Sequence, residues 1–235
     1  ASNNEVGTLQ DIAQVVKIAG QIPVHSDCVQ SFGKVSLSFK NLGLTAATIS
    51  AHKVGGPLGV AALILKRGLD IEPILHGGGQ ERDIRSGTFN APSIVSFAAA
   101  AKESVAQSQQ RSEIIRKLKA ELISTIKKGV PDIWVNGDQV KSLPGIISIT
   151  FPKTDSEGLL LLLDSEGIAC STGSACSAGV QRPSHVLLAM GLTEDETTST
   201  LRFSLNHSNT IVEIAKLGAV IASVVARSRA ASGKK

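Results

Sequence analysis

The chain has 235 residues, 42% of them hydrophobic and 3% aromatic, which suffices for one large or two modest domains with a sizeable core. The basic residues behind its formal net charge of +4 are scattered, and residues 227–229 and 234–235 are interpreted as a solvated tail, so no nucleic-acid partner is expected. No stretch has the length and apolar character of a membrane span, and no signal-peptide pattern is recognised, so we expect a cytoplasmic location without membrane contact.

Apolar periodicity predicts helices and strands that alternate along the chain. In the first half the pattern predicts a helix over 10–19, strands over 22–27, 45–50 and 60–66, a strand or extended connection over 35–39, and helices over 91–109 and 112–128. In the second half it predicts strands over 145–151, 167–170 and 200–205, and helices over 155–166, 183–190, 194–198 and 210–226. This alternation indicates the α/β class, with a mainly parallel sheet in the first part. A polar stretch over 107–110 predicts a domain boundary between residues 108 and 109.

Three cysteines, Cys28, Cys170 and Cys176, are too few for a disulfide framework, and their spacing matches no zinc motif, so no metal site is expected. Such a set is typical of a reducing compartment. Cys28 and Cys170 lie beside apolar residues and are interpreted as small buried hydrophobic residues.

Segment 50–57, Ser-Ala-His-Lys-Val-Gly-Gly-Pro, holds Lys53 between a predicted strand and a tight turn. Such a lysine can form a Schiff base, and the Ser50 hydroxyl and His52 imidazole can bind a phosphate. Together these groups indicate pyridoxal phosphate (PLP), whose aldehyde needs an amine and whose phosphate needs donors. Taken alone, the segment is more typical of a solvated loop lysine.

Further motifs follow in a fixed order: His-Ser-Asp-Cys-Val-Gln at 25–30, His-Gly-Gly-Gly-Gln-Glu-Arg at 76–82, Arg-Ser-Gly-Thr at 85–88, and Gly-Ser-Ala-Cys at 173–176. With segment 50–57, this set resembles the cysteine desulfurases, PLP enzymes of the class V aminotransferase type. The resemblance begins at the Asn-Asn-Glu-Val-Gly segment over 3–7 and extends to about residue 215. It implies a fold-type I PLP-dependent transferase, in which residues 1–108 are the C-terminal part of the large PLP-binding domain and 109–235 are the small domain with the active-site cysteine loop.

Members of this family are longer than this chain and carry a large portion ahead of its first motif. We therefore expect the sequence to be the C-terminal part of a desulfurase. The preceding portion would supply a histidine that stacks on the PLP ring and a loop at a helix N-terminus that grips the phosphate.

The resemblance assigns cofactor contacts to the first half of the chain. Lys53 would form the Schiff base and act as a base, and Ser50 and His52 would bind the phosphate. Asp27 would pair with the pyridinium nitrogen and Gln30 would donate to the phenolic oxygen. For Asp27 the alternative is a cap on a short helical turn over 28–33.

Three more positions complete the expected binding set. Thr88 would reach the phosphate of the other subunit's cofactor, which implies a homodimer with shared sites; its alternative role is the N-cap of the helix that starts near Ala91. Asn4 would contact the cofactor or the substrate carboxylate. Arg202 would clamp that carboxylate with its guanidinium fork, unless its head is merely solvated.

Cys176, in a segment rich in Ser, Gly and Ala, would be the nucleophile that takes sulfur from L-cysteine, releases L-alanine and carries a persulfide. Iron–sulfur cluster scaffolds or tRNA-thiolation proteins would then receive the sulfur. Three alternatives stay open: an inert Cys176 thiol, a selenocysteine lyase-like enzyme, or a non-catalytic remnant that serves as a dimerisation or sulfur-carrier module.

Overall fold

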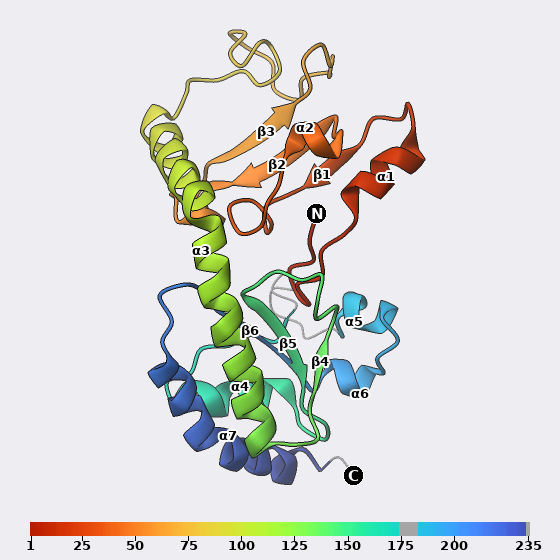
Figure 1. The fold of residues 1–235 in the computed structure, drawn as a ribbon. Coiled ribbons are helices and arrows are strands. Elements are labelled where there is room, and N and C mark those ends of the chain that lie inside the picture. The colour runs from red at the N-terminus through yellow and green to blue at the C-terminus, as the bar shows by residue number, and fades with distance from the viewer. Residues whose placement is uncertain (174–182, 234–235) are drawn as a thin grey trace. The chain divides into compact units, whose positions relative to one another are not determined.

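The computed structural model describes residues 1–173 and 183–233. The chain divides into two compact units: the first contains Ala1–Ser2 and Gln10–Gln109, and the second contains Asn3–Leu9 and Gln110–Lys235. Each unit has a three-stranded sheet among the residues described (Figure 1). The domain boundary between residues 108 and 109 stays a prediction.

The first unit contains a mixed sheet in the order β1-β2-β3. Its elements are α1 (Ile12–Ala19), β1 (His25–Asp27), α2 (Phe39–Leu42), β2 (Ala46–Ser50), the 3₁₀ turn η1 (Ala51–Val54), β3 (Ala61–Leu65) and the start of α3 (Ala91–Gly129). Strand β1 is parallel to β2, whereas β2 and β3 are antiparallel. The expected parallel pairing thus holds for β1 and β2 only. Strands β2 and β3 are antiparallel because the connection over 51–60 is too short for the crossover that a parallel neighbour requires.

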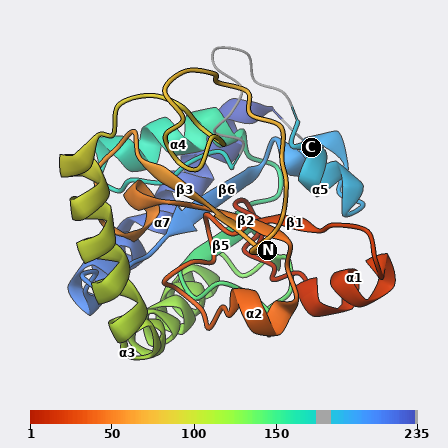
Figure 2. The same ribbon diagram turned by 90° about the horizontal axis from the view of Figure 1, so that it is seen from above.

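Helices α1 and α2 lie together beside this sheet (Figure 2). Asp11 caps α1 by accepting from the Gln14 backbone N–H, and Gly20 ends the helix with a positive φ of 61°. The core of the unit contains the buried residues Cys28, Leu44, Ala47, Ile49, Ala51 and Phe97. Full burial of Cys28 confirms its predicted role as a small hydrophobic residue.

Helix α3 is one continuous helix of 39 residues, which corrects the prediction of two helices. The polar stretch over 107–110 was expected to break it. It contains no glycine or proline, and three of its four residues are Gln, a good helix former, so the helix continues through it. The change from the first to the second compact unit therefore falls inside α3.

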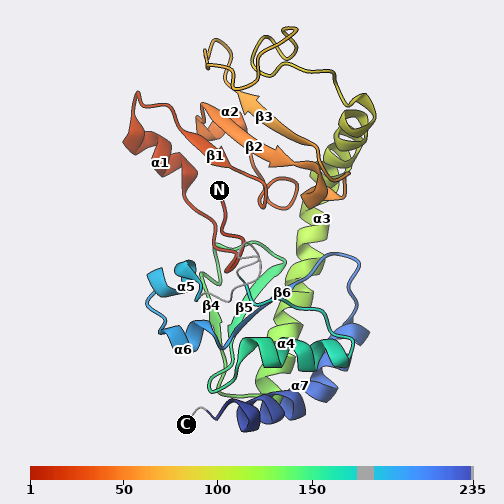
Figure 3. The ribbon, with the colours of Figure 1, turned by 180° about the vertical axis from the view of Figure 1, so that it is seen from behind.

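The second unit has an antiparallel sheet in the order β4-β5-β6 (Figure 3). Its further elements are β4 (Trp134–Asn136), β5 (Ile146–Thr150), α4 (Ser156–Ser165), α5 (His185–Ala189), α6 (Glu194–Thr197), β6 (Thr200–Ser204) and α7 (Ile211–Ser232). Apolar side chains of α3, α4 and α7 pack with those of β5 and β6 in one buried cluster. The short strand β4 was not predicted, and segment 167–170, predicted as a strand, leads instead to a single bridge between Ser171 and Arg202.

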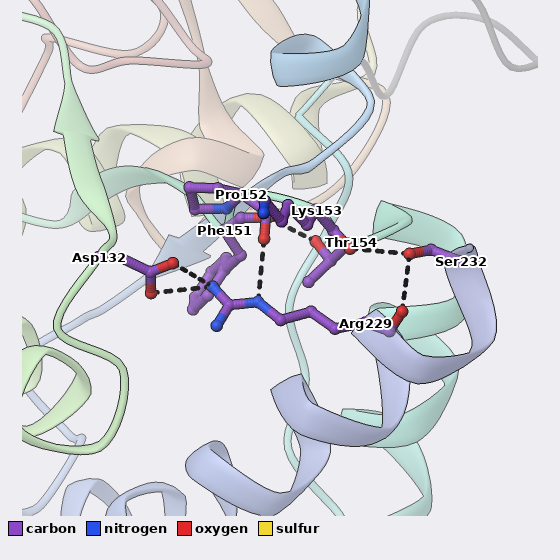
Figure 4. A network of polar contacts seen from close by, with 7 residues as sticks. All are labelled: Asp132, Phe151, Pro152, Lys153, Thr154, Arg229 and Ser232. Atoms are coloured by element: carbon purple, nitrogen blue, oxygen red, sulfur yellow. Dashed lines mark hydrogen bonds and ion pairs between the residues drawn. The ribbon is translucent and has the colours of Figure 1, made fainter. Parts of the chain in front are cut away.

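The end of α7 is a docked helix and not the predicted solvated tail (Figure 4). Arg229 donates to both carboxylate oxygens of Asp132, at 2.8 and 2.7 Å, and to the carbonyl oxygen of Pro152 at 3.0 Å. Ser232 donates to the carbonyl oxygen of Lys153 at 2.7 Å. Because the Arg229–Asp132 pair is substantially exposed, we expect it to contribute only about 0.2–1 kcal/mol. Lys234 and Lys235 lie outside the described residues.

Candidate active site

Lys53 lies on η1, immediately after strand β2, and its side chain is exposed. Ser50 ends β2, and its hydroxyl contacts Nδ1 of His52 at 2.7 Å. The turn closes with Gly55 at a φ of 86° and Gly56, where a Cβ would lie 2.9 Å from the Ala51 Cβ. The sequence thus folds three of the predicted cofactor contacts into one rigid turn, with the lysine amine accessible to a ligand.

Asp27 and Ser50 end the two parallel strands of the first sheet. Strands β1 and β2 are in register with Asp27 opposite Thr48, so their carboxyl ends meet at one sheet edge. Ligands of α/β proteins bind at such edges because loops and helix starts expose backbone and side-chain donors there. The structure therefore places Asp27, Ser50, His52 and Lys53 at a common edge.

The segment after Asp27 makes consecutive turns over residues 28–35, which we call the glutamine turn because it carries Gln30. The Cys28 carbonyl accepts from the N–H groups of Ser31 and Phe32, at 3.0 and 2.8 Å. Asp27 Oδ1 accepts from the Val29 N–H at 2.8 Å, which is the capping contact considered as the alternative for this residue. The cap uses one oxygen, and no side chain or backbone group within the described residues donates to Oδ2.

Gly33 fixes the glutamine turn against its neighbours. Its φ is 70°, and a Cβ there would lie 2.2 Å from Ser104 Oγ and 3.0 Å from Val54 Cγ1. Ser104, buried on α3, donates to the Gly33 carbonyl at 3.0 Å. The glutamine turn therefore lies between α3 and the turn that carries Lys53.

Replacement of Gly33 by alanine should lower the free energy of unfolding by at least about 3 kcal/mol, because backbone strain and a steric clash act together. The matched control is Gly55→Ala, where φ is 86° but nothing lies within 4 Å of the added Cβ, so only a loss of about 1–2 kcal/mol is expected. Urea denaturation of the two variants measures the difference. Equal losses would show that Gly33 is not tightly packed.

Gln30 has a partner that sequence reasoning missed. Lys34 Nζ donates to Gln30 Oε1 at 3.0 Å, as side chains four residues apart on a helical turn can do. Burial, with a smaller contribution from the charge of Lys53, lowers the pKa of Lys34 to about 8. The spacing of Gln30 and Lys34 was visible in the sequence, but the partial burial of the lysine was not.

Thr88 lies exposed in the loop before α3. The side chain of Asn90 accepts from the Ser93 N–H at 3.3 Å and so caps the helix. The alternative role of Thr88 as the N-cap is therefore wrong, and its predicted contact with a cofactor stays a prediction.

In the second unit, Asn4 and Arg202 lie together. Arg202 Nη1 donates to the carbonyl oxygens of Asn4 and Gly173, at 3.1 and 3.4 Å. Its Nε is buried and has no hydrogen-bond partner among the described residues, and the same is true of Ser171 Oγ on the adjacent bridge. The alternative of a merely solvated guanidinium is wrong, since Arg202 is half-buried and its Nη1 donates to two backbone carbonyl groups.

The Asn4 segment is tied down by contacts that sequence reasoning also missed. Asn3 Oδ1 accepts from the N–H groups of Glu5 and Val6, at 2.8 and 2.9 Å. The buried Glu5 carboxylate accepts from the hydroxyl of Ser184, which also caps helix α5. The sequence offered only an acidic residue inside a short polar motif as a signal for this anchor.

Cys176, the predicted nucleophile, lies outside the described residues. Cys170 is half-buried, and burial, followed by the charge of Asp164, raises the pKa of its thiol to about 11. At neutral pH Cys170 is therefore a protonated, unreactive thiol. Its burial is less complete than predicted.

Iodoacetamide at pH 8 should alkylate Cys170 on the order of 100-fold more slowly than a free small-molecule thiol, because little thiolate is present. Peptide mass spectrometry over time measures this rate, and the same measurement in urea provides the control. A rate equal to that of the free thiol would contradict the raised pKa.

The side chains of the first unit fit PLP by their chemistry. They include an accessible amine at Lys53, a hydroxyl–imidazole pair at Ser50 and His52, a carboxylate at Asp27 and an amide at Gln30. Within the residues described, no group of three His, Cys, Asp or Glu residues could hold a metal ion. No helix of this part of the chain has the length and apolar character needed to cross a membrane.

An α/β unit with polar groups at the carboxyl edge of parallel strands defines the class of ligand-binding α/β proteins. A model of the family described as Aminotransferase class-V matches residues 1–217, and the chain belongs to this family.

Several named proteins are similar to the chain. An IscS-like cysteine desulfurase of Mycobacterium tuberculosis is 42% identical over 98% of this chain and 60% of its own length. The cysteine desulfurase IscS of Methanosarcina thermophila is 37% identical over 97% of this chain and 57% of its own length. The chain thus spans about three fifths of the length of these relatives.

Solved structures show the same fold. A NifS-like protein of Rickettsia africae superposes with a TM-score of 0.86 at 38% identity, over 95% of this chain and 59% of that one. SspA in complex with cysteine superposes with a TM-score of 0.68 at 31% identity, over 89% of this chain and 58% of that one. These likenesses confirm the fold-type I α/β prediction.

Proposed function

We propose that the chain acts in a PLP-dependent cysteine desulfurase, which converts L-cysteine to L-alanine and retains the sulfur as a persulfide. The observation that carries the proposal is the Lys53 turn, with its Ser50–His52 pair beside Asp27 at the carboxyl edge of two parallel strands. The 42% identity with an IscS-like cysteine desulfurase supports the same reaction.

Each cofactor contact has a defined task in this proposal. Lys53 holds the aldehyde carbon and later moves a proton, Ser50 and His52 bind the phosphate, and Gln30 donates to the phenolic oxygen. Asp27, oriented by the Val29 N–H, keeps the ring nitrogen protonated. When bound, PLP supplies the electron sink for breaking the bond between carbon and sulfur.

The substrate contacts come from Asn4 and Arg202. Arg202 Nε, which has no partner among the residues that the structure describes, supports a role in binding the cysteine carboxylate, because a buried guanidinium donor is costly unless a ligand pairs with it. SspA, a structural neighbour, was solved in complex with cysteine. This likeness supports an amino acid substrate of that kind.

The reaction balances without an external oxidant. The Cys176 thiolate attacks the substrate sulfur, the bond between that sulfur and Cβ breaks, and its electron pair goes to the carbon side, where a proton completes alanine. The sulfur stays on Cys176 as a persulfide, so sulfur is oxidised and Cβ is reduced by the same two electrons. Iron–sulfur cluster scaffolds or tRNA-thiolation proteins are the proposed sulfur acceptors. The proposed enzyme is a cytoplasmic homodimer in which Thr88 of each subunit contacts the phosphate of the other subunit's cofactor.

A single-turnover assay tests the proposal. The purified chain, supplied with PLP and one equivalent of L-cysteine, should release alanine and gain 32 Da, about one sulfur atom, on the peptide that contains Cys176. Parallel assays use L-selenocysteine. Turnover of selenocysteine alone would support the selenocysteine lyase-like alternative, whereas PLP binding without turnover of either substrate would support the non-catalytic module.

A further inference from the structure

Lys34 is a partly buried cation that the proposed reaction leaves without a role. It lies on the glutamine turn, four residues after Gln30, and its Nζ donates to Gln30 Oε1 at 3.0 Å. The preceding Gly33 is held by Ser104 on α3 and packs beside Val54 on η1. The backbone that carries Lys34 therefore has little freedom to move.

The chemistry of this contact fixes which way the Gln30 amide points. An ammonium group has three donors and no acceptor, so it can face only the oxygen of the amide. The amide nitrogen, with its two N–H donors, must then point away from Lys34. Without the ammonium, the two ends of the amide are nearly equal in shape, and rotation about the last side-chain bond would exchange them.

We propose that Lys34 is a positioning residue that locks the Gln30 amide with its N–H donors facing the phenolic oxygen of PLP. The inference rests on the proposed function, because it assigns Gln30 the phenolic oxygen as its acceptor. In the opposite orientation the amide oxygen would meet the phenolic oxygen, and two acceptors repel each other. Lys34 thus acts through Gln30 and not by touching the cofactor.

The position of Lys34 is costly for the folded protein, which agrees with a functional role. Burial and the like charge of Lys53 both disfavour its ammonium form and lower its pKa to about 8. At pH 7 most molecules still carry the charge, so the amide is held in one orientation. An apolar side chain at this place would avoid the cost but could not orient the amide.

A double-mutant cycle on PLP binding tests the proposal at pH 7. Lys34→Met, Gln30→Leu and the double variant are titrated with PLP, and the dissociation constants are compared with that of the unchanged chain. Each single variant should weaken binding about 10-fold, and the double variant should be no weaker than Gln30→Leu. Effects of the two substitutions that multiply to about 100-fold would overturn the proposal, because a merely structural lysine would act independently of Gln30.

Two further variants separate the two functions of the glutamine. Gln30→Glu keeps an acceptor for Lys34 but removes the donors, so it should bind PLP as weakly as Gln30→Leu. Lys34→Arg keeps a donor-only cation and should restore much of the affinity lost in Lys34→Met. Tight binding by Gln30→Glu would overturn the proposal.

The contact itself is testable without PLP. In the chain alone, an NMR titration should give Lys34 a pKa of about 8, and Gln30→Leu should lower that pKa further because the charged form loses its acceptor. An unchanged Lys34 pKa in Gln30→Leu would overturn the inference at its first step. Failure of the unchanged chain to bind PLP, with the pKa shift intact, would instead overturn the proposed function and the role assigned to Gln30 with it.

Discussion

Replacement of Cys176 by serine should abolish sulfur transfer and leave PLP binding intact. A serine hydroxyl is not ionised near neutral pH and cannot take up sulfur as a persulfide, so alanine formation should fall by at least about 10³-fold. The measurement is alanine released per chain, together with the mass of the cysteine peptides after one turnover. The cofactor absorbance should be unchanged, because no proposed PLP contact involves Cys176.

The matched control is Cys170→Ser, six positions earlier in the chain. The Cys170 thiol has a pKa raised to about 11, so almost none of it is thiolate at neutral pH, and its replacement should leave alanine formation within about 2-fold. Persulfide found on Cys170 or Cys28 in the Cys176→Ser chain would contradict the assignment of the nucleophile.

Replacement of Arg202 by lysine should raise the KM for L-cysteine about 10- to 100-fold with a smaller effect on kcat. A lysine retains the charge but loses the planar fork that pairs with both carboxylate oxygens. It also loses Nε, which is buried and unpartnered in the described residues. Steady-state kinetics over a range of cysteine concentrations measures the change.

The matched control for this variant is Arg229→Lys on α7. Arg229 pairs with Asp132 on an exposed surface, so its replacement changes the same chemical group without touching a proposed substrate contact. The KM of this variant should be unchanged. Equal KM values in Arg202→Lys and the unchanged chain would remove Arg202 from substrate binding.

The sequence predicted the elements that carry the site because their signals are local. The apolar segment 45–50 and the Gly-Gly-Pro turn after it predicted β2 and the turn that carries Lys53. The predicted strand over 22–27 likewise placed Asp27 at the end of β1. The parallel pairing of β1 and β2 then brings these motifs to one edge. The motif order added the family, which periodicity alone does not supply.

The features that escaped prediction depend on packing between distant residues. The partial burial of Lys34 is one such feature, since its neighbour Gly33 accepts from Ser104, which lies 71 residues later in the chain. The contacts of Arg202 are likewise visible only in the folded chain, where its Nη1 donates to the distant Asn4 and Gly173 carbonyl groups and its Nε has no partner in the described part of the chain. Helix α3 continued through a polar stretch because polarity alone, without glycine or proline, does not end a helix.

Reductive trapping of PLP identifies the lysine that binds the cofactor. The purified chain is incubated with PLP, reduced with borohydride, digested and mapped by peptide mass, with Lys53→Arg as the control. We expect an adduct on the peptide that contains Lys53 and none in the control. Lys34 is the competing amine, because its pKa of about 8 makes it readily deprotonated. An adduct on Lys34, or none on Lys53, would contradict the assignment of Lys53 as the lysine that binds the cofactor.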